Sequence, residues 1–270
     1  MVRSKRFVST LSLLIFLTSF IGFEKPSYAD SPDTIDGAGT VKVTGSDRSD
    51  IVDPENPEKP ANPGESPYTT GPLRIDFVSA LNFGKAETKK SDRKYLALAQ
   101  QFFDETEARG SYVQLTDQRG VSTGWSLQVK QQTQFRNPVI QNREEQELVG
   151  AYLSLDKGWA KSSSDSLAPT VTRETIAINA MDTAYEVATA NKGAGRGVWT
   201  IAFGASKTNS DNQPTTLQPL VDKEGKAILD EEYQKPAQTN SAVTLTVPET
   251  TKIYPVQYET KLTWILAELP

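Results

Sequence analysis

The stretch of sequence that decides the fold is Gly124-Trp125-Ser126-Leu127-Gln128-Val129-Lys130. Its large apolar residues stand at every second position, which is the period of a β-strand with one buried face. The same Trp-x-Leu pattern returns near the C-terminus as Trp264-Ile265-Leu266, and the two copies use two of only four tryptophans. Each copy therefore presents one Trp and one Leu side by side on one face of a strand.

Alternation of the same period dominates the chain after Tyr68. The Gly, Asn, Asp and Pro residues between the alternating segments are typical of turns. The pattern predicts an all-β fold, an antiparallel β-sandwich of about eight strands. The expected strands contain Leu73–Phe77, Val113–Leu115, Trp125–Val129, Val149–Leu155, Ile176–Ile178, Trp199–Phe203, Val243–Val247 and Tyr258–Leu266.

Three segments depart from this alternation. Tyr95–Phe103 has apolar residues at helical spacing, so it is either a short helix or a fully buried strand, and Met181–Asn191 is similarly ambiguous. Residues 205–241 are polar and rich in Thr, Asn, Gln and Pro. They predict a long polar insertion at one edge of the sandwich, and loops of this length in compact domains are usually functional or mobile.

The N-terminus carries the pattern of a secretory signal peptide. Three basic residues precede an apolar run from Phe7 to Phe23, and Ser27-Tyr28-Ala29 fits the small-x-small rule for cleavage before Asp30. A membrane anchor is the alternative interpretation, but the run is short and is broken by Ser and Thr. We expect residues 1–29 to be removed and the mature protein to be secreted, with no membrane insertion.

Residues 30–67 are acidic and proline-rich, with nine acidic residues against three basic ones and no aromatic residue. A segment of this composition buries too little apolar surface to offset its ordering entropy, so we predict a disordered linker. The folded β domain is then expected over residues 68–270, which is long enough for one sizeable core.

Composition excludes several classes of function. The chain has no Cys and no His, which removes Ser-His-Asp and Cys-His catalysis and the usual zinc sites. Its net charge of −5 becomes about −8 when a signal peptide of net charge +3 is lost, and no basic stripe occurs, so no nucleic acid is expected as a partner. A two-carboxylate glycosidase remains, but the adjacent pairs Glu144-Glu145 and Glu231-Glu232 are typical of solvated loop charges. We predict a protein that is not an enzyme and has no cofactor and no metal.

The C-terminal string Tyr258-x3-Leu262-Thr263-Trp264-x-Leu266-x3-Pro270 is similar to the signature of the WxL domain, found in surface proteins of Gram-positive bacteria. Further blocks stand in the order of that family: Gly71–Val78, Leu81–Gly84, Thr116–Gly120, Gly124–Leu127, Leu148–Ala151 and Trp199–Gly204. The resemblance covers residues 68–270. It implies non-covalent attachment to the cell wall through peptidoglycan, and work in clusters with membrane-anchored or other WxL-type surface proteins.

The candidate binding residues are those of the two Trp-x-Leu motifs and a polar rim beside them, namely Trp125, Leu127, Trp264, Leu266, Asp117 and Arg119, with Gln128 as a further rim residue. An indole covers the apolar C–H face of a sugar, while rim side chains hydrogen-bond its hydroxyls. Most strand Trp-Leu pairs in a sandwich are core, so each motif is either core or contact surface. The alternative function is protein–protein docking or adhesion, through a strand added at an exposed edge.

Overall fold

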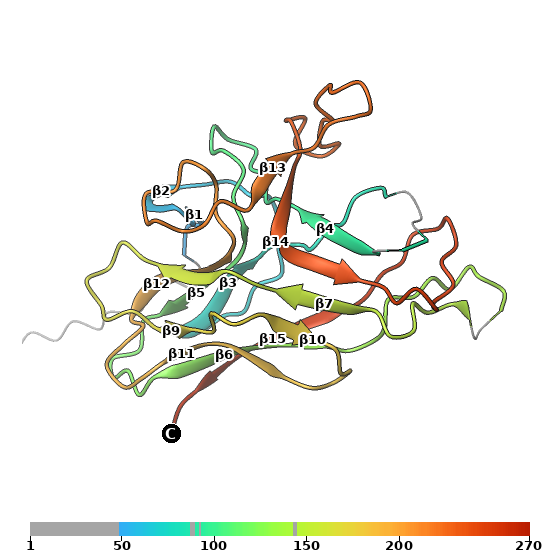
Figure 1. Ribbon diagram of the computed structural model, residues 1–270. Helices are drawn as coiled ribbons and strands as arrows, with labels where there is room; N and C mark the ends of the chain where they lie inside the picture. Colours follow the sequence, from blue (N-terminus) through green and yellow to red (C-terminus); the bar gives the residue numbers. More distant parts are fainter. Residues whose placement is uncertain (1–48, 87–89, 92, 143–144) are drawn as a thin grey trace, which may run out of the picture. The chain divides into compact units, whose positions relative to one another are not determined.

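The computed structural model describes residues 49–86, 90–91, 93–142 and 145–270. Over these residues the protein is all-β, with fifteen strands that pair antiparallel in four sheets (Figure 1). The predicted all-β, antiparallel class is confirmed, but the described residues form fifteen strands where about eight were expected. The predicted signal peptide and residues 30–48 of the predicted linker lie outside the described residues.

Three of the sheets make up most of the fold. The motif sheet has the order β15 (Leu262–Glu268), β6 (Trp125–Gln131), β11 (Tyr185–Ala190), β9 (Thr170–Val171). The central sheet has the order β3 (Leu73–Val78), β5 (Ser111–Asp117), β12 (Gly197–Phe203), β8 (Gly158–Lys161). The flanking sheet has the order β10 (Ile176–Ile178), β7 (Tyr152–Leu155), β14 (Gln238–Thr246), β13 (Leu217–Pro219), and β4 (Lys94–Leu98) also pairs with β14.

The motif sheet and the central sheet form a sandwich. β15 approaches β3 at one edge and β8 approaches β9 at the other. One cluster of buried apolar residues fills the space between them, with Leu127 from the motif sheet and Leu115 and Ile201 from the central sheet. Leu153 and Val243 of the flanking sheet join the same cluster, so all three sheets share one main core.

Both ambiguous segments contain strands. β4 covers the start of Tyr95–Phe103, and β11 covers most of Met181–Asn191. In β4 the residue Ala97 is fully buried and both of its neighbours are partly buried, so the strand is covered on both faces and the alternation of period two is lost. The predicted polar insertion, residues 205–241, holds the short strand β13 and the beginning of β14.

The structure differs from the sequence prediction over residues 49–67, which were assigned to the disordered linker. Strands β1 (Val52–Asp53) and β2 (Asn56–Pro60) form a small antiparallel hairpin here. Ile51 is buried in a second apolar cluster with Phe77, Tyr112 and Trp159. We call residues 49–64 the N-terminal strap, and its residues belong to the folded domain.

The strap is ordered because it covers a polar face of the central sheet. Val52 N–H donates to Gln114 Oε1 at 2.9 Å, and Gln114 Nε2 donates to the Asp50 carbonyl at 2.9 Å. Thr200 Oγ1 donates to the Pro54 carbonyl at 3.4 Å. As a result β5 is buried at every position, on its polar face as well as its apolar one. The prediction of disorder depends on how little apolar surface the segment can bury. The segment is held instead by hydrogen bonds of its backbone N–H and carbonyl groups.

Buried charges fasten the strap further. Arg109 makes a two-pronged ion pair with Asp53, with Nε–Oδ1 at 2.8 Å and Nη2–Oδ2 at 2.9 Å. Burial alone raises the pKa of Asp53, but the hydrogen bonds from Arg109, Asn56 and the Glu55 N–H outweigh it and leave the pKa below its usual value. The Glu55 carboxylate accepts hydrogen bonds from Ser206 N–H at 2.7 Å and from its hydroxyl at 2.6 Å.

Removing Arg109 should destabilise the fold strongly. In Arg109→Ala the buried Asp53 and Glu55 carboxylates lose their cation, which typically costs about 3–5 kcal/mol. We expect this loss in the free energy of urea-induced unfolding. Lys85→Ala is the matched control, because its ion pair with Glu231 is almost fully exposed and should leave stability unchanged. Equal stability of the two variants would contradict a fastened strap.

Candidate functional site

The two Trp-x-Leu motifs lie on neighbouring strands. β15 pairs with β6 antiparallel, in a register that sets Leu266 opposite Leu127. Trp264 stands opposite Val129, and Glu268 stands opposite Trp125. Since side chains opposite each other in a sheet share a face, the two motifs form one continuous apolar surface.

The first motif is core. Trp125 and Leu127 are both 0% exposed, so neither side chain is open to a ligand. The indole Nε1–H of Trp125 donates to the Gly195 carbonyl at 3.0 Å. Gln128, the further rim candidate, is next to Leu127 in the strand and so points to the opposite face of β6.

The second motif is only partly buried. Trp264 and Leu266 pack against the main core from the edge strand β15. The ring of Trp264 lies 6.3 Å from that of Phe203, centroid to centroid. This motif closes one side of the core, and part of its surface stays accessible.

Asp117 and Arg119 form an ion pair that ties the two motifs to the central sheet. Arg119 Nε–H and Nη2–H donate to Asp117 Oδ1 and Oδ2 at 2.9 and 2.8 Å. Arg119 Nη1 lies 3.0 Å from Glu268 Oε1, and its Nη2–H donates to the Gly124 carbonyl at 2.9 Å. The pair therefore links the end of β5, the turn before β6 and the end of β15.

The same contacts set the charge state of Asp117. Burial raises the pKa of its carboxyl, but hydrogen bonds from the side chain and N–H of Arg119, its positive charge and a hydrogen bond from Ser122 outweigh burial. The pKa of Asp117 is consequently below its usual value, and the group is a carboxylate at neutral pH.

Two tryptophans support one glycine-rich turn, Gly193–Gly197. Trp125 Nε1–H holds the Gly195 carbonyl, and Trp199 Nε1–H donates to the Arg196 carbonyl at 2.9 Å. Gly195 has a φ of 69°, and a Cβ there would lie 2.5 Å from Trp125 Nε1. Only glycine fits this position. The first motif thus positions a turn instead of contacting a ligand.

The outer side of this turn borders an open depression of about 690 Å³, which we call the motif-side depression. The loop 164–167 also lines the depression, and it is joined to the turn by hydrogen bonds from Gly195 N–H to the Leu167 carbonyl at 2.8 Å and from Arg196 N–H to Ser166 Oγ at 3.0 Å. The depression is lined by Asp117, Gln118, Ser164, Asp165, Ser166, Leu167, Gly193, Arg196 and Gly197.

The depression offers polar groups of several kinds. The Arg196 side chain is exposed, and it makes a long hydrogen bond of 3.4 Å to the Arg119 carbonyl. Leu167 is 73% exposed and adds an apolar patch. A guanidinium, hydroxyls and carboxylates around one apolar side chain suit a polar, hydroxyl-bearing ligand. Across the described residues no group of acidic side chains is placed to hold a metal ion.

Of the six predicted site residues, Asp117 alone lines the depression. The sequence interpretation missed Arg196 and the loop 164–167. The signals in the sequence are the glycine-rich run Gly193–Gly197 and the serine-rich run Ser162–Ser166. Neither signal shows that the two segments meet.

Comparison with known protein families places the chain in a class of cell-surface domains. The family described as WxL domain, surface cell wall-binding, matches residues 30–270, and the chain belongs to this family. No curated protein and no solved structure matches. In the part of the chain that the structure describes, no helix is long and apolar enough to cross a membrane.

Trp125→Phe should destabilise the fold although it keeps an aromatic ring. The change leaves the buried Gly195 carbonyl without its donor, which costs about 1–3 kcal/mol. Trp264→Phe is the matched control in the second motif, because the Trp264 indole N–H has no hydrogen-bond partner among the described residues. We expect the larger loss for Trp125→Phe in urea-induced unfolding; a larger loss for Trp264→Phe would contradict the supporting role.

The Asp117–Arg119 pair predicts a sensitivity to acid. Because the folded-state pKa of Asp117 is lowered, its stabilisation is present above the unfolded-state pKa of about 3.9 and is lost as the pH falls through the folded-state value. Asp117→Asn should therefore be less stable at neutral pH and lose less stability between about pH 5 and pH 3. Urea unfolding at several pH values measures this slope, and an unchanged slope would argue against the assignment.

Proposed function

We propose that this protein is secreted and attaches non-covalently to the peptidoglycan of a Gram-positive cell wall through the motif-side depression. The observation that carries the proposal is the position of the depression. It borders the turn that the first Trp-x-Leu motif supports, in a domain of a cell wall-binding family.

The chemistry of the depression supports this ligand. Peptidoglycan presents sugar hydroxyls, amides and the carboxylates of its peptides. Ser164 and Ser166 can exchange hydrogen bonds with hydroxyls and amides, and the exposed Arg196 guanidinium can hold a carboxylate with two parallel hydrogen bonds. Because Arg196 is the one cation among the residues that line the depression, salt is expected to weaken wall binding only slightly.

We further propose that the protein binds without catalysis. A glycosidase of the two-carboxylate type needs one carboxyl whose pKa is raised, so that it can act as a general acid. One carboxyl of each candidate pair, Glu145 and Glu231, has a pKa shifted the other way, and so has Asp117 beside the depression. Hydrogen bonds from Tyr254 and Lys252 lower the pKa of Glu145, Lys85 lowers that of Glu231, and Arg119 lowers that of Asp117.

Sedimentation with isolated peptidoglycan tests the proposal. Arg196→Ala should weaken wall binding by at least about tenfold, because it removes both charge-assisted hydrogen bonds of the guanidinium. Lys192→Ala is the matched control, since it removes an equal charge from the same exposed region but lies outside the depression. The control should pellet like the wild type. Failure of the wild type to pellet at any salt concentration would refute wall binding, and equal pelleting of Arg196→Ala would refute this site.

One observation favours docking to another protein as a second function. β15 ends the motif sheet, and among the described residues no further strand pairs with its outer edge. A membrane-anchored or other WxL-type surface protein could add a strand there, through backbone hydrogen bonds. Pull-down of such a partner, together with absence of wall sedimentation, would make docking the primary function.

A further inference from the structure

The outer edge of β15 carries a row of backbone groups that point away from β6. At one end of the β6–β15 ladder, Gln132 N–H donates to the Lys261 carbonyl at 2.8 Å. At the other end, Leu269 N–H donates to the Gly124 carbonyl at 3.2 Å. Because alternate residues of an antiparallel strand bond to the same neighbour, the odd-numbered residues of β15 bond to β6. The outward groups belong to the even-numbered residues Leu262, Trp264, Leu266 and Glu268.

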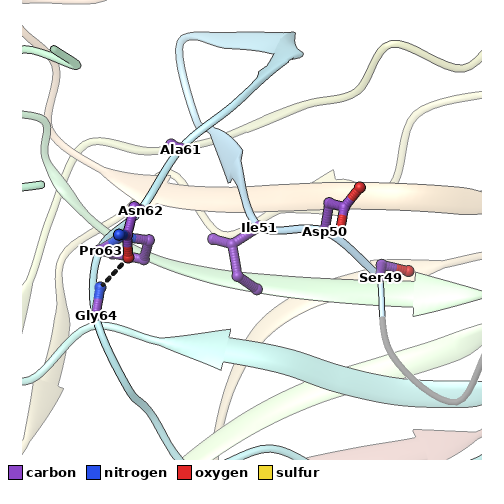
Figure 2. Close-up of a pocket in the computed structure, with 7 residues that line it drawn as sticks. All are labelled: Ser49, Asp50, Ile51, Ala61, Asn62, Pro63 and Gly64. Carbon is purple, nitrogen blue, oxygen red and sulfur yellow. Dashed lines mark hydrogen bonds between the residues drawn. The ribbon is translucent and has the colours of Figure 1, made fainter. Parts of the chain in front are cut away.

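Nothing in the described part of the chain takes up this row. β15 ends the motif sheet, and no described segment makes a backbone hydrogen bond to its four outward residues. The nearby edge of the central sheet is covered, since Thr69 N–H donates to the Ile75 carbonyl and Ile75 N–H donates to Thr69 Oγ1, both at 2.8 Å. The strap covers the polar face of that sheet, and Figure 2 shows its arms Ser49–Ile51 and Ala61–Gly64 with the small cavity between them. β15, which leads to the C-terminus in Figure 1, is left with an open edge.

β15 lacks the features that usually stop an open edge from pairing. From Leu262 to Ala267 the strand carries no charge and no proline. Its register with β6 runs without a bulge over the whole strand. Trp264 and Leu266 are only partly buried, so apolar side chains accompany the free backbone groups. An edge of this kind is expected to take up another strand.

We propose that the strand it takes up is β15 of a second copy of this chain, in antiparallel pairing. The four outward residues are arranged symmetrically about Ile265, so a two-fold axis at Ile265 brings each of them into a hydrogen-bonded pair. Trp264 then stands opposite Leu266 of the second copy, and Leu262 stands opposite its Glu268. Every outward N–H and C=O group gains a partner, and the two motif sheets become one continuous sheet.

The side chains favour the same pairing. Trp264 and Leu266 of the second copy form an apolar cross-strand pair that covers the accessible part of both. Glu268 is the one charge of the strand. Antiparallel pairing sends its two copies to opposite ends of the join, about 20 Å apart at roughly 3.3 Å per residue. In-register parallel pairing would instead set these two like charges side by side.

The inference rests on the proposed docking function, for which it names the partner, and it does not depend on wall binding through the motif-side depression. A join between two single strands is small, so we expect a reversible dimer that forms at high protein concentration.

Single-cysteine variants of the mature chain test both the partner and the register, because the chain has no cysteine. Ile265 pairs with itself across the axis in a non-hydrogen-bonded pair, whose Cα atoms are about 4.5 Å apart and within disulfide reach. Ile265→Cys should therefore give a covalent dimer on mild oxidation, measured by non-reducing electrophoresis. Thr263→Cys is the matched control on the same face. Its two copies would stand about 13 Å apart along the join, so it should give no such dimer.

Charge at the same position gives an independent measurement by sedimentation equilibrium. Ile265→Lys sets two ammonium groups against each other and should abolish the dimer, and Ile265→Glu should do the same. An equal mixture of the two variants should restore it, which damage to the fold would not allow. Gln128→Lys is the matched control, because Gln128 stands opposite Ile265 on β6, one strand away from the join. This control should dimerise like the wild type.

A wild type that stays monomeric at the highest concentration reached, or equal crosslinking of Ile265→Cys and Thr263→Cys, would overturn the pairing of two copies. The proposals fail separately. Docking of a different WxL-type protein at this edge, by a chain that does not pair with itself, keeps the docking function and removes this inference. A specific Ile265→Cys crosslink in a protein that does not pellet with peptidoglycan removes wall attachment and keeps the inference.

Discussion

The register between β6 and β15 is the constraint on which the rest of the domain depends. It places Leu266 opposite Leu127 and brings Glu268 to Trp125. A slip by one residue would turn the apolar face of β15 away from the core and withdraw Glu268 from Arg119. Apolar packing and the ion pair therefore select the same register. Because these two interactions favour the same alignment, β15 keeps a single register although it is an edge strand, hydrogen-bonded to a neighbour on one side only.

The Trp-x-Leu motif serves the candidate site indirectly. Trp125 is buried, yet its indole N–H fixes the turn whose outer side lines the motif-side depression. Trp199 holds the next carbonyl of that turn. A buried residue that shapes a surface loop couples folding to binding, so a large truncation of Trp125 removes both and cannot reveal a contact. Side chains of the turn itself, such as Arg196, separate the two effects because they contribute little to the core.

Sequence periodicity predicts strands well where one face is apolar and the other stays partly exposed, as at Gln128 and Lys130 of β6. It is ambiguous for β4, because neighbours on both faces remove the alternation. For the strap the sequence prediction is wrong. Alternation in β5 indicates that Gln114 and Thr116 face solvent, whereas both side chains are fully buried beneath the strap. Those side chains hydrogen-bond a segment that composition alone assigns to disorder. The site follows the same logic. The motifs are visible in the sequence, but the depression depends on a bridge between Leu167 and Ala194, which no local pattern encodes.

Arginine–aspartate ion pairs hold both the motif-side depression and the N-terminal strap in a chain that has no cysteine. Arg119 with Asp117 stands beside the depression, and Arg109 with Asp53 fastens the strap. Replacing both partners of a buried ion pair by apolar residues typically changes the stability of a fold little. Neutralising one partner leaves the other charge buried and unpaired, which destabilises the fold strongly. The two ion pairs therefore hold the local structure in place only while their aspartates are ionised. Both carboxyls have lowered pKa values, so the depression and the strap are both held at neutral pH and loosen together in strong acid.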